Sequence, residues 1–452
     1  MNKPSGLVKG LIIAAPSSGS GKTVLTLGLL RHLAGKGKPI ASAKAGPDYI
    51  DPAFHTAATG EPCYNLDLWA MRPSLLSCAA ALGRNDSTVI CEGVMGLFDG
   101  AIMERGSTAD LAEVTGWPVV LIVDAAAQGA SAGAVLRGFA THRSNFSPVG
   151  VIFNRIGGVR HKKILCEAAA QAAPDVEVLG YVPKTANLNL PDRHLGLIQA
   201  IEHENLESFL NSAASLVAEH IDVDKLLSLA LPLKLNDGGA CNPIAPLGQR
   251  IAIADDEAFS FRYTLTLEGW KNEGAELSFF SPLNDQAPSD NVDAVYLPGG
   301  YPELHCNRLS SSRKFMRGLR QAADNGAIVF GECGGYMVLG KGLVDAKGQY
   351  HAMAGLIPLE TSFAKRKLNL GYREVVLDAK AAIGSDEVLG VPGQRFRGHE
   401  FHYATILSKN SSRPLFQSYD AAGNDLGHAG FANGRVMGSF IHLIDRMDDS
   451  NG

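Results

Sequence analysis

Two short segments, far apart in the chain, contain residue types that could do chemistry. PSSGSGKT occupies residues 16–23, and GECGG occupies residues 331–335. The first is typical of a loop that holds the phosphates of a nucleotide, and the second is typical of a turn that exposes a nucleophile. A chain with both sites is predicted to use ATP to make a carboxylate reactive and glutamine as its source of ammonia.

The first segment predicts an ATP site. The backbone N–H groups of Gly19, Ser20 and Gly21 can converge on phosphate oxygens, and the N-terminus of a following helix adds partial positive charge. Lys22 would reach the β- and γ-phosphates, and the hydroxyl of Thr23 would bind Mg²⁺. The match to the usual pattern GxxxxGK[ST] is partial, because a proline stands at the first glycine position. The alternative is an ordinary glycine- and serine-rich turn before a helix.

Acidic side chains follow two other predicted strands. KAGPDYIDPAFH contains Asp48 and Asp51, and EGVMGLFDG contains Glu92 and Asp99. Because ligands of open parallel sheets bind at the carboxyl ends of strands, we expect these carboxylates near the nucleotide. Thr23, Asp48 and Glu92 would bind Mg²⁺, Asp48 and Asp99 would take part in catalysis, and Asp51 would contact the substrate. The alternative is that these carboxylates cap helices.

Cys333, in the second segment, is predicted to be the nucleophile of a glutaminase. It follows the apolar run AIVF and is flanked by small residues, as a strand–turn–helix elbow requires. Its base would be His442, in GSFIHLI. The backbone N–H groups of Gly334 and of Gly299 or Gly300, in LPGGYPE, would stabilise an oxyanion. A small buried thiol without a catalytic role is the alternative.

The segment RGHEFHY contains two further histidines. If it is a strand, Glu400 and His402 share one face and His399 lies on the other. Because no cysteine or carboxylate trio accompanies these histidines in the sequence, we expect substrate binding or domain contact, and not a metal site. Structural histidines with satisfied hydrogen bonds are an equally good alternative.

The pattern of the first half predicts a parallel sheet. Short apolar runs alternate with helix-like stretches, which is typical of α/β proteins with helices on both faces of the sheet. Strands are predicted at residues 11–15, 39–43, 89–92, 119–124, 149–154 and 176–182, and helices at residues 22–33 and 131–141. Asn154 ends one of these strands and would contact the adenine. Residues 201–231 are predicted to form a helical tail.

A stretch rich in glycine, proline and asparagine, residues 234–248, predicts a linker between two domains. The ATP-binding domain would span residues 1–233, and the glutaminase domain would span residues 249–447. In the second domain, strands are predicted at residues 251–254, 275–280, 294–297 and 327–331, and helices at residues 259–272 and 311–325.

Composition narrows the function further. The net charge of −5 gives no basic surface for nucleic acid, and no apolar run reaches the roughly 20 residues that a membrane span needs. The apolar residues near the start are predicted to form a first strand and not a secretory signal, so we expect a cytoplasmic protein. The seven cysteines include no CxxC pair, which argues against a zinc site.

Four segments together, KAGPDYIDPAFH, EGVMGLFDG, LPGGYPE and GHEFHY, closely resemble the cobyrinate and hydrogenobyrinate a,c-diamide synthases of cobalamin biosynthesis. The resemblance covers nearly the whole chain. It implies a P-loop domain similar to dethiobiotin synthetase, fused to a class I glutamine amidotransferase domain. It also implies that ATP and Mg²⁺ drive amidation of the a and c carboxylates of hydrogenobyrinate or cobyrinate, with L-glutamine as nitrogen donor. A homodimer is compatible with the sequence.

The resemblance places the nucleophile at Cys333 and the activating histidine at His442, and it supports the four acidic residues as active-site groups. One departure concerns the histidine. Many class I glutaminases have His-x-Glu, but Leu443 and Ile444 follow His442 here. The resembled subgroup also lacks this glutamate. We therefore expect glutaminase activity that is slow or tightly coupled to synthesis.

Two other functions compete with this one. A cobyric acid synthase-like amidotransferase would share both domains but act on other corrin side chains. A P-loop regulatory ATPase with a non-catalytic second domain would not need the cysteine turn, so that turn argues against it. KAGPDYIDPAFH and YNLDLWAMRP resemble the hydrogenobyrinate branch more than the cobyrinate branch.

Overall fold

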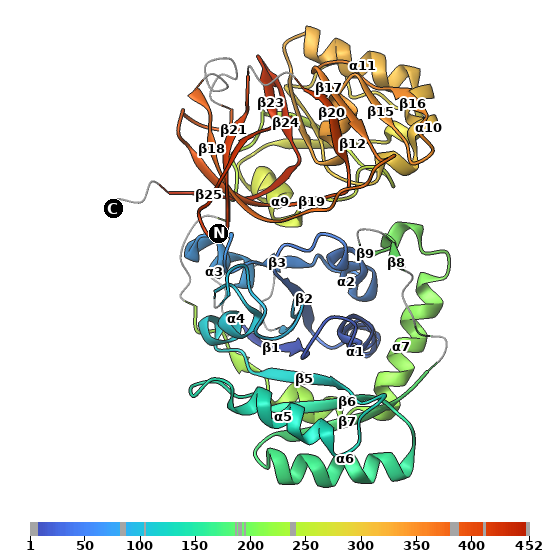
Figure 1. Ribbon diagram of the computed structural model, residues 1–452, viewed down its shortest axis with the longest axis vertical. Helices are drawn as coiled ribbons and strands as arrows, with labels where there is room; N and C mark the ends of the chain where they lie inside the picture. The colour runs from blue at the N-terminus through green and yellow to red at the C-terminus, as the bar shows by residue number, and fades with distance from the viewer. Residues whose placement is uncertain are drawn as a thin grey trace. The chain divides into compact units, whose positions relative to one another are not determined.

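The computed structural model divides the chain into two compact units (Figure 1). It describes residues 8–81, 87–103, 105–185, 188, 192–193, 196–235, 241–379, 388–409 and 413–448. The first unit contains Met1–Trp69 and Pro73–Ala240, and the second contains Ala70–Arg72 and Cys241–Gly452. Part of the predicted linker, residues 236–240, lies outside the described residues. No helix in the described part of the chain is long and apolar enough to cross a membrane.

A parallel sheet is the centre of the first unit. Its strands lie in the order β3 (Tyr64–Leu66), β2 (Ile40–Ala45), β4 (Thr88–Glu92), β1 (Lys9–Ala14), β5 (Val119–Asp124), β6 (Gly150–Ile156) and β7 (Glu177–Pro183). A short strand, β10 (Leu231–Pro232), pairs antiparallel to β1. The six strands predicted for this half are all present, and β3 is additional. Their interiors are apolar because helices cover both faces of the sheet.

The order of the strands determines on which face of the sheet each helix lies, because parallel crossovers are right-handed as a rule. The chain moves one way along the sheet from β1 to β3 and the other way from β4 to β7, so the connecting helices lie on opposite faces. Figure 1 shows α1, α2 and α7 on one side and α3, α4 and α5 on the other. The helices are α1 (Lys22–Gly35), α2 (Asp51–Thr59), α3 (Pro73–Ala81), α4 (Thr108–Thr115), α5 (Ser131–Thr141), α6 (Val159–Ala172), α7 (Leu206–His220) and α8 (Val223–Ser228).

The predicted helical tail is confirmed as α7 and α8. Close packing of α7 on α1 depends on Gly28, because a Cβ atom there would collide with the backbone of Ala213. A 3₁₀ turn (η1, Ala200–Glu202) and a two-stranded pair, β8 (Asp192–Arg193) and β9 (Gly196–Leu197), precede α7.

A second, mostly parallel sheet is the centre of the second unit. Its order is β12 (Glu276–Phe280), β11 (Arg250–Ala254), β13 (Ala294–Leu297), β14 (Ile328–Glu332), β24 (Val436–Ser439) and β23 (Phe431–Asn433), and only β23 pairs antiparallel. The helical segments are α9 (Thr264–Asn272), η2 (Pro282–Asn284), η3 (Pro302–Leu304), α10 (Cys306–Ser311), α11 (Arg313–Asp324) and α12 (Gly334–Leu339).

The four strands predicted for this unit are confirmed, but one predicted helix begins too early. The sequence predicts a helix from residue 259, whereas α9 begins at Thr264. The N–H of Phe261 instead donates to the carbonyl of Gly299 at 2.9 Å, so this stretch pairs with the loop after β13. Phe259, before α9, is buried against Phe315 of α11 and not by a helical face of its own.

Two further sheets, one antiparallel and one mixed, complete the second unit. One has the order β22 (Asp425–Ala429), β21 (Phe416–Asp420), β18 (Asn369–Leu377), β19 (Arg395–His402) and β25 (Ile441–Met447). The other has the order β16 (Tyr350–Ala352), β15 (Gly342–Val344), β17 (Leu359–Ser362) and β20 (Thr405–Lys409), in which β15 and β17 run parallel.

Alternate residues of the central strands enter different cores. Ile251 and Ile253 of β11 belong to a buried cluster that includes Phe396 of the larger antiparallel sheet. Ala252, between them, belongs to a cluster that includes Phe315 of α11. This period of two residues follows from strand geometry, and it explains why β11 is apolar on both faces.

Candidate active site

The phosphate loop connects β1 to α1 and takes left-handed turns that its glycines allow. Gly19 has a φ of 79°, and Gly21 has a φ of 94°. A Cβ atom at position 21 would collide with the side-chain amide of Asn154. Glycine is therefore required at position 21 both by the backbone conformation and by the close approach. A loop of this kind at the start of a helix is suited to phosphate oxygens.

Asn154 and Arg155, at the end of β6, hold this loop in place. Asn154 Nδ2 donates to the carbonyl of Ser20 at 2.9 Å, and Arg155 Nη1 donates to the carbonyl of Gly19 at 2.9 Å. The hydroxyl of Ser20 donates to the carbonyl of Ser17 at 2.9 Å. The buried amide of Asn154 thus shapes the loop, and its contact with adenine stays a prediction.

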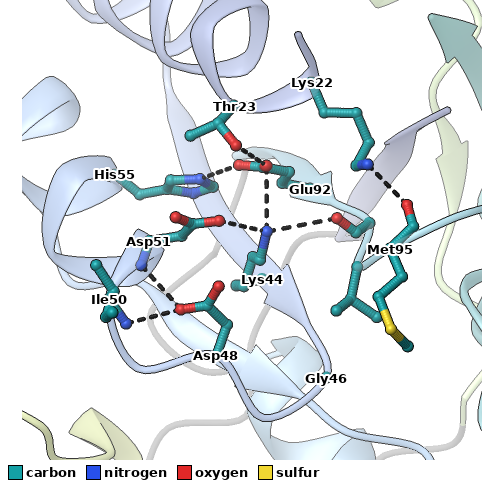
Figure 2. A network of polar contacts seen from close by, with 12 residues as sticks. Lys22, Thr23, Lys44, Gly46, Asp48, Ile50, Asp51, His55, Glu92 and Met95 are labelled. Carbon is teal, nitrogen blue, oxygen red and sulfur yellow. Dashed lines mark hydrogen bonds and ion pairs between the residues drawn. The ribbon is translucent and has the colours of Figure 1, made fainter. Parts of the chain in front are cut away.

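Lys22 is the first residue of α1, and its side chain turns back toward the loop (Figure 2). Its Nζ donates to the carbonyl of Met95 at 2.7 Å and to that of Ser17 at 3.4 Å. Burial lowers the pKa of Lys22, although the charge of Glu92 opposes the shift. A lysine held by carbonyl oxygens can exchange them for phosphate oxygens, which are stronger acceptors for a cation.

A network of buried charged side chains lies beside Lys22 (Figure 2). Lys44 Nζ is 2.6 Å from Asp51 Oδ2 and 3.1 Å from Glu92 Oε1. The hydroxyl of Thr23 donates to Glu92 Oε1 at 2.6 Å. Glu92 Oε2 is 2.7 Å from His55 Nε2. The structure therefore brings together three predicted residues, Thr23, Asp51 and Glu92, and adds a lysine and a histidine.

The register of the sheet explains why these side chains meet. Lys44 in β2 and Ile13 in β1 both pair with Glu92 in β4. Because paired residues of neighbouring strands point to the same face, the side chains of Lys44 and Glu92 lie next to each other. Asp51 begins α2 and His55 follows one turn later, so both can face the same strand ends.

Burial and ion pairing shift the pKa values of these side chains in opposite directions. Burial would raise the pKa of Glu92, but Lys44 and His55 outweigh it and hold that pKa well below its usual range. Burial raises the pKa of Asp51, and the nearby charge of Asp48 adds to the shift. Burial would lower the pKa of Lys44, yet its two carboxylate partners raise it. Lys44 is therefore cationic and Glu92 anionic at neutral pH.

His55 is the second cation of the network. Burial alone would lower the pKa of His55, but contacts with Cys63 and Glu92 outweigh it and raise the pKa to about 10. Cys63 Sγ lies 3.6 Å from His55 Nδ1, and Glu92 lies against the other ring nitrogen. The positive charge of His55 thus helps to keep Glu92 ionised in a fully buried position.

The other two predicted carboxylates make local contacts. Asp48 Oδ1 accepts hydrogen bonds from the backbone N–H groups of Ile50 and Asp51, at 2.7 and 3.1 Å. Asp99 Oδ2 accepts one from the N–H of Gly96 at 2.8 Å. Asp48 therefore stabilises the start of α2, as the capping alternative predicts. A catalytic or metal-binding role for Asp48 or Asp99 stays a prediction.

The oxygen donors beside the phosphate loop suit Mg²⁺. Thr23 Oγ1 and Glu92 Oε1 are 2.6 Å apart, and both are hard donors of the kind that Mg²⁺ prefers. In the part of the chain that the structure describes, no group of three or more His, Cys, Asp or Glu side chains is arranged to hold a metal ion. The residues present therefore fit an ion that takes at most two carboxylates and a hydroxyl from the protein and completes its shell with phosphate oxygens and water.

Cys333 lies on a sharp turn between β14 and α12, as the sequence predicts. Its φ of 47° and ψ of −105° are unusual for a residue with a side chain, and such strain is typical of a nucleophile elbow. Its N–H donates to the carbonyl of Ser439 at 2.8 Å. Burial, reinforced by the charge of Glu303, raises the pKa of the Cys333 thiol. The thiol is therefore protonated and needs a base.

His442 lies next to Cys333, and Gly299 packs against both. A Cβ atom on Gly299 would come within 3.1 Å of the Cβ of Cys333 and would collide with the ring of His442. Burial lowers the pKa of His442 to about 3, and the neighbouring His399 and His402 add to the shift. The imidazole is therefore neutral and can accept the proton of the thiol.

The two glycine-rich turns of this unit meet behind the nucleophile. A Cβ atom on Gly334 would lie 2.9 Å from the backbone nitrogen of Gly300, and the N–H of Gly335 donates to the carbonyl of Pro298 at 3.1 Å. Side chains at these positions would separate the turns. The packing brings the backbone of both turns close to Cys333, and their oxyanion role stays a prediction.

Strand β19 presents its two histidines to different faces, as the alternation predicts. His399 pairs with His442 in the neighbouring strand β25. His402 Nε2 is 2.9 Å from Glu400 Oε1, and its ring stacks on Phe440 with 3.8 Å between centroids. Both histidines thus lie near the cysteine site, and substrate binding by either stays a prediction.

Sequence reasoning missed three buried charged or titratable residues at these sites. Lys44 and His55 lie within KAGPDYIDPAFH, in which the sequence predicts roles for the aspartates alone. Glu332 directly precedes Cys333 and is buried, and it has no predicted role. The sequence does contain a signal for such residues, namely a charged residue at or near the carboxyl end of an apolar strand. A charged residue in that position is rarely buried without a partner.

The fold and the two sites define a glutamine amidotransferase joined to a nucleotide-binding domain. Residues 250–449 match the family described as CobB/CobQ-like glutamine amidotransferase domain, and residues 11–198 match the CobQ/CobB/MinD/ParA nucleotide binding domain. The α/β fold class predicted for both halves is thereby confirmed.

Full-length relatives define the family more narrowly. The chain is 52% identical over 443 residues to a hydrogenobyrinate a,c-diamide synthase of Rhizobium meliloti (strain 1021), covering 97% of this chain and 99% of the relative. It is 51% identical over 441 residues, with the same coverage, to a synthase of that name from Brucella abortus biovar 1 (strain 9-941). The chain belongs to the hydrogenobyrinate a,c-diamide synthase family, and the resemblance seen in its motifs is confirmed.

Proposed function

We propose that this protein uses ATP and glutamine to amidate the a and c carboxylates of hydrogenobyrinate. Cobyrinate, the cobalt-containing counterpart, is the alternative substrate. One observation carries the proposal: a single chain combines a phosphate loop flanked by the Lys44–Glu92 pair with a strained cysteine beside a neutral histidine. Residues 1–233 would be the ligase domain and residues 249–447 the glutaminase domain, with residues 234–248 between them.

In the ligase domain, the γ-phosphoryl group of ATP would pass to a carboxylate of the ring and form an acyl phosphate. A carboxylate resists attack because oxide is a poor leaving group, whereas phosphate leaves readily. Backbone N–H groups of the phosphate loop and Lys22 would bind the phosphates. Mg²⁺ held by Thr23, with Glu92 and Asp48 as the other proposed ligands, supplies charge neutralisation when bound.

The carboxylates near the loop would orient the acceptor. Lys44 offers a positive charge for an incoming carboxylate, but in this structure it is shared between Asp51 and Glu92. Asp51 and Asp99 would position the ring side chain or the attacking ammonia. Ionised Glu92 fixes the Thr23 hydroxyl at the start of α1.

In the glutaminase domain, Cys333 Sγ would attack the amide carbon of glutamine while its proton moves to His442. The tetrahedral oxyanion would be stabilised by N–H groups of Gly299, Gly300 or Gly334. His442 would return the proton to the leaving nitrogen, so ammonia departs and a glutamyl thioester remains. Water then releases glutamate. His399 and His402 would line the glutamine site.

Isotope transfer tests the central step. With substrate carboxylates labelled with ¹⁸O, each amide formed should place one ¹⁸O atom in inorganic phosphate. Product mass after incubation with metal-free or cobalt-containing ring identifies the preferred substrate and the number of amides. A product amidated without ¹⁸O in phosphate would contradict the acyl phosphate.

Cys333→Ala tests the division of labour. We expect this variant to lose glutamine-dependent amidation by at least about 1000-fold, because the covalent step is removed. Amidation with high free ammonia should persist. Cys166→Ala, at an exposed cysteine, should leave both activities unchanged. Loss of both activities in Cys333→Ala alone would contradict the proposal.

A further inference from the structure

Position 444 is the place where a His-x-Glu glutaminase has the glutamate that orients its histidine, and here it holds a buried isoleucine. A different carboxylate lies beside the imidazole. We propose that Glu332, the residue before the nucleophile, is the positioning residue of His442. The proposal rests on the glutaminase function proposed above and assigns its missing third group.

Glu332 is held from two sides. Its Oε2 lies 3.9 Å from Nδ1 of His442 and accepts a hydrogen bond from the hydroxyl of Tyr296 at 2.6 Å. Its Oε1 accepts a hydrogen bond from the N–H of Leu443 at 3.0 Å. The second bond ties the carboxylate to the residue next to His442, so the distance between carboxylate and imidazole is set by the backbone of β25.

The chain reaches this arrangement through sheet topology. Glu332 ends β14, and β14 pairs with β24, whose last residue is followed after one position by β25. His442 is the second residue of β25. A carboxylate that precedes the nucleophile can therefore face the Nδ1 side of the imidazole, while Gly299, which also packs against Cys333, lies at its Cε1–Nε2 edge.

The surroundings of His442 disfavour its protonated form, so a nearby negative charge would assist catalysis. Burial disfavours the imidazolium, and His399 and His402 on β19 disfavour it further. When Cys333 forms its bond to the amide carbon, the thiol proton moves to Nε2 of His442 and a positive charge appears. An anionic Glu332 would stabilise that charge through space, since 3.9 Å is beyond hydrogen-bond length but short in a buried site.

Other charged groups near the nucleophile do not replace it. Glu303 of η3 and Glu400 of β19 disfavour the thiolate of Cys333, as Glu332 itself does. Glu400 is already engaged with Arg373 and His402. Glu332 Oε2, by contrast, lies at an ion-pair distance from His442 Nδ1.

Glu332→Gln in the full-length protein tests the role, because the amide keeps the shape but removes the charge. We expect the kcat for glutamine-dependent amidation to fall about 100-fold, with little change in the KM for glutamine. Ammonia-dependent amidation should be unaffected. A structural role alone would instead change the KM, the thermal stability and the ammonia-dependent rate together.

The double variant with His442→Asn separates positioning from structure. If Glu332 acts through His442, adding Glu332→Gln to His442→Asn should cause no further loss of glutamine-dependent activity. Multiplicative losses would overturn the proposal, as would an unchanged kcat in Glu332→Gln. If Glu332→Gln does not fold, Glu332→Asp, which keeps the charge, is compared with Glu332→Ala, which removes it. In folded protein, Glu332→Asp should retain more glutamine-dependent activity than Glu332→Ala, and equal losses would overturn the role.

The pH profile supplies a signature that packing would not change. Burial raises the pKa of Glu332 to about 7. Glutamine-dependent kcat of the wild type should therefore rise as pH increases through about 7, and this rise should vanish in Glu332→Gln. A wild-type protein that cannot use glutamine at all would refute the glutaminase function. A Glu332→Gln variant that uses glutamine as well as the wild type would refute only the role of Glu332.

Discussion

Lys44 is a residue whose surroundings limit what can replace it. Its side chain is 4% exposed, and its ammonium group contacts two buried carboxylates, Asp51 and Glu92. Buried charges are tolerated in proteins only when they are paired and hydrogen-bonded. His55 adds a second positive charge, so the network is close to electrically balanced. Loss of one cation would leave a carboxylate uncompensated.

Lys44→Met is therefore expected to reduce the free energy of unfolding by about 3–5 kcal/mol, because one partner of a buried ion pair is removed. The defect should shrink as pH falls, since the unpaired carboxylates then have raised pKa values and the folded state binds more protons than the unfolded state. Urea unfolding at pH 5 and pH 8 measures both effects.

Lys36→Met, at an exposed lysine after α1, is the matched control and should change stability by less than about 0.5 kcal/mol. A Lys44→Met variant as stable as the wild type at pH 8 would show that the network contributes no net stability.

At the level of elements, the cysteine site depends on how closely the turn after β13 approaches the elbow after β14. Gly299 is the point of contact, because a side chain there would collide with His442 and crowd Cys333. Gly299 does not have a left-handed φ, so a substitution is limited by space alone. The turn therefore sets the distance between base and nucleophile.

Gly299→Ala should displace the imidazole and reduce glutamine-dependent amidation at least about 100-fold, because catalysis is sensitive to displacements of about 1 Å. Ammonia-dependent amidation should persist, since the phosphate loop lies in the other unit. Both rates can be measured on one preparation.

Gly138→Ala is the control. Gly138 lies within α5, and a Cβ atom there meets open space. Alanine should leave both rates unchanged and raise stability by up to about 1 kcal/mol through its helix propensity. Equal effects of the two substitutions would argue against the close contact at Gly299.

At the scale of the whole molecule, one chain holds two chemistries that must share ammonia. Near neutral pH free ammonia is mostly protonated and is then no nucleophile. Release into solvent would also dilute it, whereas release within the same chain keeps its effective concentration high. We therefore expect ammonia to pass from the second unit to the first without mixing with bulk solvent.

Mixing two inactive variants tests this expectation. Cys333→Ala keeps the ligase residues, and Lys22→Ala keeps the glutaminase residues. Glutamate release by Lys22→Ala is measured first, so that the mixture is known to contain a working glutaminase. An equimolar mixture should show less than about a tenth of the wild-type glutamine-dependent rate, because ammonia released by one chain is diluted before it reaches another. Recovery of half the wild-type rate would show that ammonia travels through solvent.

Much of the fold was predictable because strands and helices leave local patterns. Apolar runs of four to six residues gave the central strands of both units, and the glycine-rich turns identified the phosphate loop and the elbow. The helix predicted from residue 259 began too early because Phe261 is buried in an extended segment, whose backbone pairs with Gly299, and not on a helical face. Apolar residues alone do not distinguish these two kinds of burial.

The sequence by itself determined which groups this protein has for chemistry: a phosphate loop, a cysteine on a sharp turn, and carboxylates after strands. Only the tertiary structure decided their partners. Glu92 meets Lys44 through strand register, and Glu332 meets His442 through strands more than 100 residues apart. Local spacing cannot specify such pairs, because the contacts are set by how strands align in a sheet.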